Sequence, residues 1–266
     1  MGQPGYTIHG GQTDEDRLAR QAGVMAAATM AFLAGVGARP GMACLDLGCG
    51  DGQVSIQLAR LVGPAGRVVG IDTDGDAIAI ARRAAAAAGV EVTFVEGDAA
   101  IPAERDGFDL AFSRLLLSHL VDPMAVVRAM CISVRPGGVV AVEDLYTPAL
   151  HAEPPVPALD RLAAIYSATV RARGGDPAIG PRLPAHLTAA GLHDVGEHTV
   201  VNRMTTAHDK LFLAHLLDDM HAAILDTGSA TPDELADVRA AVAAAANRPD
   251  TTFFQARMHQ VSGRRP

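Results

Sequence analysis

Short apolar runs alternate with segments of helical periodicity along the first half of the chain. Five runs have the valine, isoleucine, leucine, alanine and phenylalanine content of buried strands: residues 43–47, 67–72, 92–99, 108–114 and 139–142. Between them, apolar residues recur at helical spacing over residues 54–62 and 76–88, and a further helix is expected from Asp122 to just before Arg135. This alternation predicts an α/β fold with a parallel sheet covered by helices.

The second half of the chain contains more helical segments than strands. The expected helices cover residues 158–173, 184–190 and 207–225, with another capped by Thr231. Two strands, 194–204 and 252–261, lie on either side of the last two of these helices. A helix near the start of the chain is expected to be capped by Thr13 and to end at residues 35–37.

A glycine-rich turn joins the first predicted strand to the first helix. Gly48, Gly50 and Gly52 stand at alternate positions, where the backbone can approach a ligand without side-chain collision. The amino end of the following helix supplies free N–H groups and a positive dipole. The turn is therefore a ligand site for a dinucleotide or for S-adenosylmethionine. A dinucleotide fingerprint needs its third glycine one residue later, where Gln53 stands.

Acidic residues and short motifs follow the later strands in a regular order. The second strand ends in Asp72, the third in Gly-Asp-Ala at 97–99, and the fourth in Ser113-Arg114. An Arg-Pro-Gly-Gly turn at 135–138 then precedes the fifth strand, which ends in Glu143-Asp144. This succession resembles the class I S-adenosylmethionine-dependent methyltransferases over about residues 44–144.

The resemblance implies S-adenosylmethionine as the cofactor and assigns its contacts by position. The methionine part is expected at the glycine turn, the ribose at Asp72 and the adenine at Asp98. Tyr6 and His9 lie in an amino-terminal arm that, in similar methyltransferases, can fold over the cofactor, and a frayed terminus is the slightly favoured alternative. The implied cofactor-binding residues are Tyr6, Asp46, Gly48, Gly50, Asp72, Thr73, Asp98, Ala99, Ser113 and Arg114.

The resemblance also implies the full architecture, a Rossmann-like, seven-stranded class I methyltransferase sheet with helices on both faces and helical lid insertions. We expect one domain over residues 1–266. Its parts are an amino-terminal arm and helix (1–40), a cofactor-binding core (41–145), a lid and acceptor insertion (146–190) and a helical insertion between the last two strands (205–248).

Candidate catalytic residues follow the fourth and fifth strands. His119 is the first candidate for a general base, and a structural role in its loop is the alternative. Glu143, Asp144 and Tyr146 at the end of the fifth strand are the next candidates, although Asp144 could instead cap backbone N–H groups. Methyl transfer requires positioning above all, and no metal-ligand pattern occurs in the sequence.

An apolar stripe on the predicted helix 207–225 allows two interpretations. Leu211, Phe212, Leu216 and Met220 either build the acceptor pocket over the cofactor edge or form the seam of a homodimer. The pocket is favoured, because the insertion returns to the strand ends where the methyl group must lie. The acceptor is then a small and fairly hydrophobic organic molecule.

Composition narrows the remaining function classes. The 266 residues carry a net charge of −8 with a single lysine, so nucleic acid is not the expected acceptor. No apolar run is long enough for a membrane span, and the first residues do not form a signal peptide. Three cysteines without a C-x-x-C pair favour reduced thiols and a cytoplasmic location. A cyclase or binding protein reusing the fold and, less favoured, an NAD-dependent oxidoreductase are the alternative functions.

Overall fold

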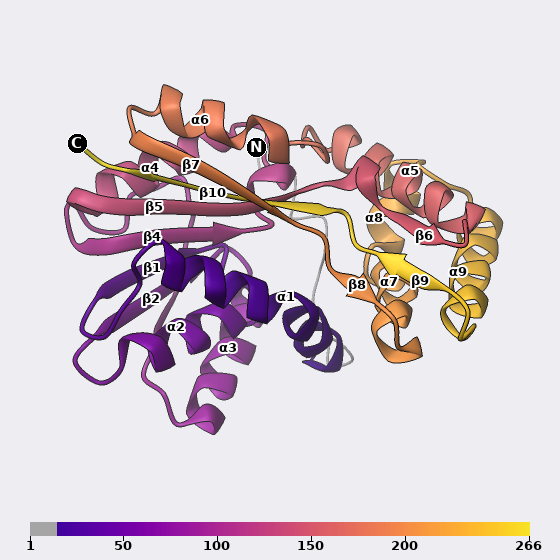
Figure 1. Cartoon of the computed structure of the whole chain (residues 1–266), viewed down its shortest axis with the longest axis horizontal. Helices are drawn as coiled ribbons and strands as arrows, with labels where there is room; N and C mark the ends of the chain where they lie inside the picture. The colour runs from indigo at the N-terminus through magenta and orange to yellow at the C-terminus, as the bar shows by residue number, and fades with distance from the viewer. Residues whose placement is uncertain (1–14) are drawn as a thin grey trace.

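The computed structural model describes residues 15–266, and a seven-stranded sheet forms the larger of its two lobes (Figure 1). Its strands are β1 (Ala43–Leu47), β2 (Arg67–Asp72), β3 (Thr93–Glu96), β4 (Phe108–Arg114), β5 (Val134–Tyr146), β7 (His193–Val200) and β10 (Arg257–Arg264). The spatial order is β3-β2-β1-β4-β5-β10-β7, and β10 runs antiparallel to both of its neighbours. The carboxyl ends of β1, β2, β4 and β5 therefore meet at one edge of the sheet.

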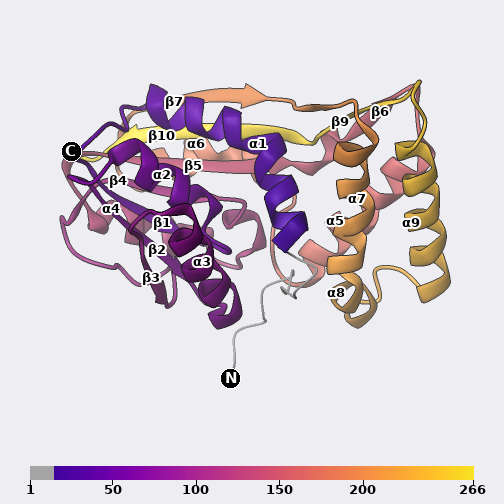
Figure 2. The same ribbon diagram turned by 90° about the horizontal axis from the view of Figure 1, so that it is seen from below.

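Helices cover both faces of this sheet, as the sequence predicts. One face carries α1 (Glu15–Gly35), α2 (Gln53–Val62) and α3 (Gly75–Ala88), and the other carries α4 (Pro123–Ser133) and α6 (Leu183–Ala189) (Figure 2). Each face has its own hydrophobic core, because buried valine and leucine side chains of the strands point alternately to either side.

The second lobe consists of helices and a small sheet that the sequence does not predict. Its helices are α5 (Pro157–Ala172), α7 (Ala207–Asp219), α8 (His221–Asp226) and α9 (Pro232–Ala246). Its strands β6 (His151–Glu153), β9 (Thr252–Phe254) and β8 (Arg203–Met204) pair antiparallel in that order. A separate cluster of buried side chains, including Leu159, Phe212 and Phe253, holds the lobe together. We call this part of the chain the helical lobe.

Several predicted element boundaries need correction. The predicted strands 194–204 and 252–261 each divide into two, since β7 and β10 belong to the large sheet while β8 and β9 belong to the small one. The predicted helix 207–225 is interrupted at Met220, which separates α7 from α8. The expected Thr13 cap lies outside the described residues.

The fifth strand is much longer than the apolar run 139–142 that predicts it. β10 pairs with β5 from Val139 to Tyr146, so pairing extends the strand into its polar end. At the other end, the predicted turn at 135–138 is an irregularity within the strand, because Val134 and Val139 pair with Phe108 and Leu110 of β4.

Candidate active site

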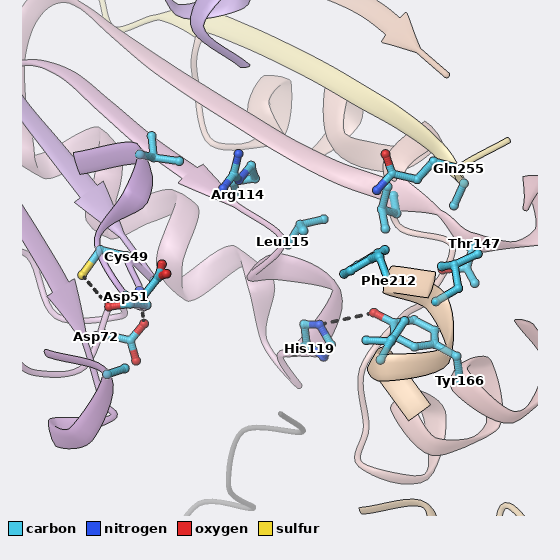
Figure 3. Close-up of a pocket in the computed structure, with 18 of the residues that line it drawn as sticks. Cys49, Asp51, Asp72, Arg114, Leu115, His119, Thr147, Tyr166, Phe212 and Gln255 are labelled. Carbon is cyan, nitrogen blue, oxygen red and sulfur yellow. Dashed lines mark hydrogen bonds between the residues drawn. The ribbon is translucent and has the colours of Figure 1, made fainter. Parts of the chain in front are cut away.

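A cavity of about 170 Å³ lies between the carboxyl ends of the core strands and the helical lobe (Figure 3). Residues from Asp46 to Arg114 line one part, which we call the glycine-loop half. Residues from Leu115 to Ala256 line the other part, which we call the helical half. Both lobes therefore contribute walls to a single space.

The glycine turn forms the floor of the glycine-loop half. Gly48 and Gly50 both have positive φ, and a side chain at Gly50 would meet no protein atom within 4 Å. The turn thus leaves room for a ligand at Gly50. Gly52 differs, because a Cβ there would lie 2.6 Å from the ring of Phe94, so this glycine permits packing of α2 against β3.

Asp72 connects the ends of β1 and β2. Its Oδ2 accepts a hydrogen bond of 2.8 Å from the backbone N–H of Gly50, and its Oδ1 accepts one from Asp74. Burial raises the pKa of Asp72 above its ordinary value. Each carboxylate oxygen has a second lone pair, so Asp72 can shape the turn and still accept hydrogen bonds from a ligand.

Asp46 also lines the cavity, although only 2% of its surface is exposed. Its Oδ2 accepts a hydrogen bond of 2.6 Å from the Ser55 hydroxyl. The pKa of Asp46 is raised to about 6, chiefly by burial and to a smaller extent by the carboxylates Asp72 and Asp51, while the Ser55 hydrogen bond and Arg114 oppose the rise. When ionised, this carboxylate can pair with a cationic group of a ligand in the cavity.

Arg114 closes the glycine-loop half and is tied to helix α1. Its guanidinium donates to the Thr29 hydroxyl at 3.2 Å, and Thr29 donates to Glu143 at 2.7 Å. The other carboxylate oxygen of Glu143 accepts a hydrogen bond from Gln260. Among residues 15–266, this network fixes the only arginine that lines the cavity.

Glu143 and Asp144 do not line the cavity, and their catalytic roles stay predictions. Glu143 is held in the network just described and is 2% exposed. Asp144 is fully buried and accepts hydrogen bonds from the backbone N–H groups of Ser118 and Leu145, at 2.9 and 2.8 Å. The capping alternative for Asp144 fits this geometry, and the carboxylate fixes the segment that carries His119.

His119 ends the short helix η2 (Leu117–His119) and lines the cavity at the junction of its two halves. Its Nε2 lies 3.4 Å from the Tyr166 hydroxyl of α5. Burial lowers the pKa of His119 to about 4, so the imidazole is neutral at physiological pH and can accept a proton or a hydrogen bond.

The structure brings together only part of the predicted cofactor set. Asp46, Gly48, Gly50, Asp72 and Arg114 line the cavity. Four others do not, namely Thr73, Asp98, Ala99 and Ser113. Asp98 accepts a hydrogen bond from the N–H of Ala100, and Ser113 is 1% exposed. Their cofactor roles stay predictions, and Tyr6 and His9 lie outside the part of the chain that the structure describes.

The helical lobe divides the predicted apolar stripe into two groups. Phe212 and Leu216 line the cavity, whereas Met220 is fully buried in the core of the lobe. Sequence reasoning missed Thr147 and Gln255, which supply polar side chains to the helical half. Neither residue belongs to a recognisable motif. The long-range pairing of β5 with β10 and of β6 with β9 brings them to the cavity, so no local sequence pattern indicates their position.

Comparison with known proteins identifies the family. The model of a family described as a methyltransferase domain matches residues 38–177, just over half of the chain. The chain therefore belongs to this methyltransferase domain family. A ubiquinone biosynthesis O-methyltransferase from a Shewanella species is 35% identical over 103 residues, which cover 38% of this chain and 42% of that protein. The chain spans 29–55% of the length of the first curated relatives that it matches.

Solved structures of other proteins resemble this chain in their fold. The YcgJ protein from Bacillus subtilis has a TM-score of 0.57 at 17% identity, with 86% of this chain and 94% of that chain covered. The cyclase SpnF has a TM-score of 0.55 at 20% identity, with 99% and 86% covered. These likenesses establish the Rossmann-like methyltransferase fold, including its arrangement beyond the part that the family model matches.

Proposed function

We propose that the protein is an S-adenosylmethionine-dependent methyltransferase that acts on a small and fairly hydrophobic organic molecule. One observation carries the proposal: a single cavity joins the glycine turn of a methyltransferase-family domain to an apolar chamber built by the helical lobe. Donor and acceptor can thus meet in one enclosed space, and a direct displacement depends mainly on such positioning.

The residues of the glycine-loop half fit this cofactor. The open space at Gly50 admits the methionine part, and Asp46 and Arg114 offer opposite charges to its ammonium and carboxylate groups. Asp72 stands at the end of β2, where it can accept the ribose hydroxyls. When bound, the cofactor supplies an electrophilic methyl group, and the protein supplies its orientation.

His119 stands between the two halves and is the proposed proton acceptor. Its imidazole is neutral, because burial lowers its pKa, and its position next to the helical half brings it close to an acceptor there. The alternative is that His119 only orients the acceptor through a hydrogen bond.

No helix among residues 15–266 is long and apolar enough to cross a membrane. We propose a cytoplasmic enzyme that acts on free small molecules and not on nucleic acid, because the net charge is −8. The apolar stripe of α7 lies inside the helical lobe or faces the cavity, which supports the pocket over the homodimer seam.

The test combines binding and turnover. Asp72→Ala removes a carboxylate that accepts charge-assisted hydrogen bonds, so S-adenosylmethionine should bind more than tenfold more weakly by calorimetry, while circular dichroism shows a folded protein. Asp76→Ala, which removes an exposed carboxylate of α3 that does not line the cavity, is the matched control and should bind nearly as well as the wild type. Equal affinities of the Asp72→Ala variant and the wild type would remove Asp72 from the site.

Formation of S-adenosylhomocysteine separates transfer from mere binding. A methyltransferase releases it in the presence of an acceptor. A cyclase or binding protein on the same fold binds the cofactor and releases none, and a protein that binds NAD instead would restore the oxidoreductase alternative.

A further inference from the structure

The two halves of the cavity differ in charge, and this difference bears on the acceptor. The glycine-loop half contains the carboxylates Asp46, Asp51, Asp72 and Asp74 and the guanidinium of Arg114. The helical half, over its described lining residues, contains no aspartate, glutamate, lysine or arginine. Its polar groups are neutral: the imidazole of His119, the hydroxyls of Tyr166 and Thr147, and the amide of Gln255.

A chamber without charged side chains discriminates strongly against ionised ligands. An ammonium or carboxylate group taken from water into such a space, without a partner, loses several kcal/mol of solvation. A neutral ligand loses far less and gains from contact with the apolar walls formed by leucines and Phe212. The acceptor is therefore uncharged where it lies in the helical half.

His119 and Tyr166, two polar residues that line the helical half, can together bind one hydroxyl group of a ligand. Nε2 of His119 and the hydroxyl of Tyr166 lie 3.4 Å apart, and they come from the core and from the helical lobe respectively (Figure 3). A neutral imidazole can accept a hydrogen bond from a ligand hydroxyl, while a phenol can donate one to its oxygen. Both residues line the same cavity as the glycine-loop half, where the transferred methyl group must lie.

We propose that the acceptor carries a neutral, weakly acidic hydroxyl group, of the phenol or enol class, on an apolar body, and that His119 and Tyr166 recognise this group. This inference rests on the proposed function. In the reaction the hydroxyl oxygen forms a bond to the methyl carbon, and the methyl–sulfur bond breaks with its electron pair left on sulfur. The hydroxyl proton passes to Nε2 of His119, and Tyr166 is a specificity-determining residue.

Four naphthalene probes test the class of acceptor without any need for turnover. They are 2-naphthol, naphthalene-2-carboxylate, 2-(aminomethyl)naphthalene and naphthalene itself, titrated against the full chain at neutral pH by calorimetry. We expect 2-naphthol to bind at least tenfold more tightly than the anion and the cation. Equal or tighter binding of either ionised probe, or binding of none of the four, would overturn the proposal.

Two conservative variants test the recognition itself. Tyr166→Phe removes one hydroxyl and should reduce the preference for 2-naphthol over naphthalene by about two- to tenfold, the loss of one neutral hydrogen bond. Tyr146→Phe removes the same group outside the cavity and should leave the preference unchanged. An unchanged preference in Tyr166→Phe would contradict the assignment of Tyr166.

The product distinguishes this proposal from the underlying function. With S-adenosylmethionine present, mass spectrometry should find the methyl ether of 2-naphthol, and a carbon-methylated product would overturn the hydroxyl assignment. Selective binding of 2-naphthol by a protein that binds no S-adenosylmethionine would instead contradict the proposed methyltransferase and leave the acceptor class standing.

Discussion

Asp144 illustrates how a carboxylate next to an active site can act at a distance from the chemistry. It accepts the backbone N–H groups of Ser118 and Leu145, and Ser118 directly precedes His119. Burial raises the pKa of Asp144 to about 6, so the group is held at a cost in solvation that its hydrogen bonds offset. The position of His119 thus depends on a residue that does not line the cavity.

Removal of this carboxylate should lower stability first. Asp144→Ala leaves the buried N–H group of Ser118 and the partly buried one of Leu145 without this acceptor, so the free energy of unfolding should fall by about 2 kcal/mol in urea denaturation. Asp144→Asn keeps one acceptor oxygen and should lose less. A fully stable Asp144→Ala variant with abolished turnover would instead restore the catalytic interpretation.

The raised pKa of Asp46 predicts a pH dependence of cofactor binding. Above about pH 6 the carboxylate is ionised and attracts a cationic ligand, and below that value it becomes protonated. The affinity for S-adenosylmethionine should therefore decrease as the pH falls through about 6, by up to tenfold per pH unit. Calorimetry between pH 5 and pH 8 measures this dependence.

Asp46→Asn is the control for this prediction, because the carboxylates of Asp72 and Asp51 lie near Asp46 and influence its pKa. The variant should bind more weakly at pH 7.5 and lose most of the pH dependence. If the dependence persists undiminished, one of the neighbouring carboxylates causes it.

At the residue scale, local motifs predicted the glycine turn and Asp72, because the strand, turn and acid are close in sequence. The network of Thr29, Glu143 and Arg114 was not predictable in this way. Thr29 and Glu143 are separated by 114 positions, and only the folded chain shows that a conspicuous carboxylate is already engaged.

Among the elements, α7 has the most direct bearing on function, because one face of it lines the cavity and the other packs into the helical lobe. Phe212 lines the cavity and also belongs to the core of the lobe, whereas Met220, just after the helix, belongs to that core and does not line the cavity. The two residues are both large, apolar and buried, but their substitutions should have different consequences.

Phe212→Ala should raise the KM for the acceptor about tenfold or more, because it removes apolar contact area from the helical half. Cofactor affinity should change little. Met220→Ala leaves a cavity in the core instead and should lower stability by about 2–5 kcal/mol, with acceptor KM nearly unchanged in the folded fraction. Steady-state kinetics and thermal denaturation of both variants provide the comparison, and an unchanged acceptor KM in Phe212→Ala would place the acceptor elsewhere.

The boundaries of a strand were predictable where the whole strand lies within one sheet. β1, β2 and β4 are buried on both faces, and their apolar runs give their limits. The last two predicted strands each pass from the large sheet into the small one, so a single run of residues serves two environments. Their division depends on pairing partners from distant parts of the chain and leaves no local signal.

Over the whole molecule, the cavity lies at the junction of two lobes with separate hydrophobic cores. The sequence predicted the methyltransferase core through its ordered motifs, and it predicted helical insertions near the strand ends. It did not predict the small sheet that holds the insertions together, because β6, β8 and β9 are two or three residues long. Such short strands are stable only within their tertiary context.

The helical lobe is built from two separate stretches of the chain, and this has a consequence for protein engineering. Its core combines one stretch of chain around α5 with another from Met204 to Ala256, and the chain returns to the large sheet between them as α6 and β7. A chimera that takes only one of these stretches from a homologue would join two halves of unrelated cores. Exchange of acceptor specificity by recombination therefore requires both stretches to be transplanted together, as one unit with two insertion points.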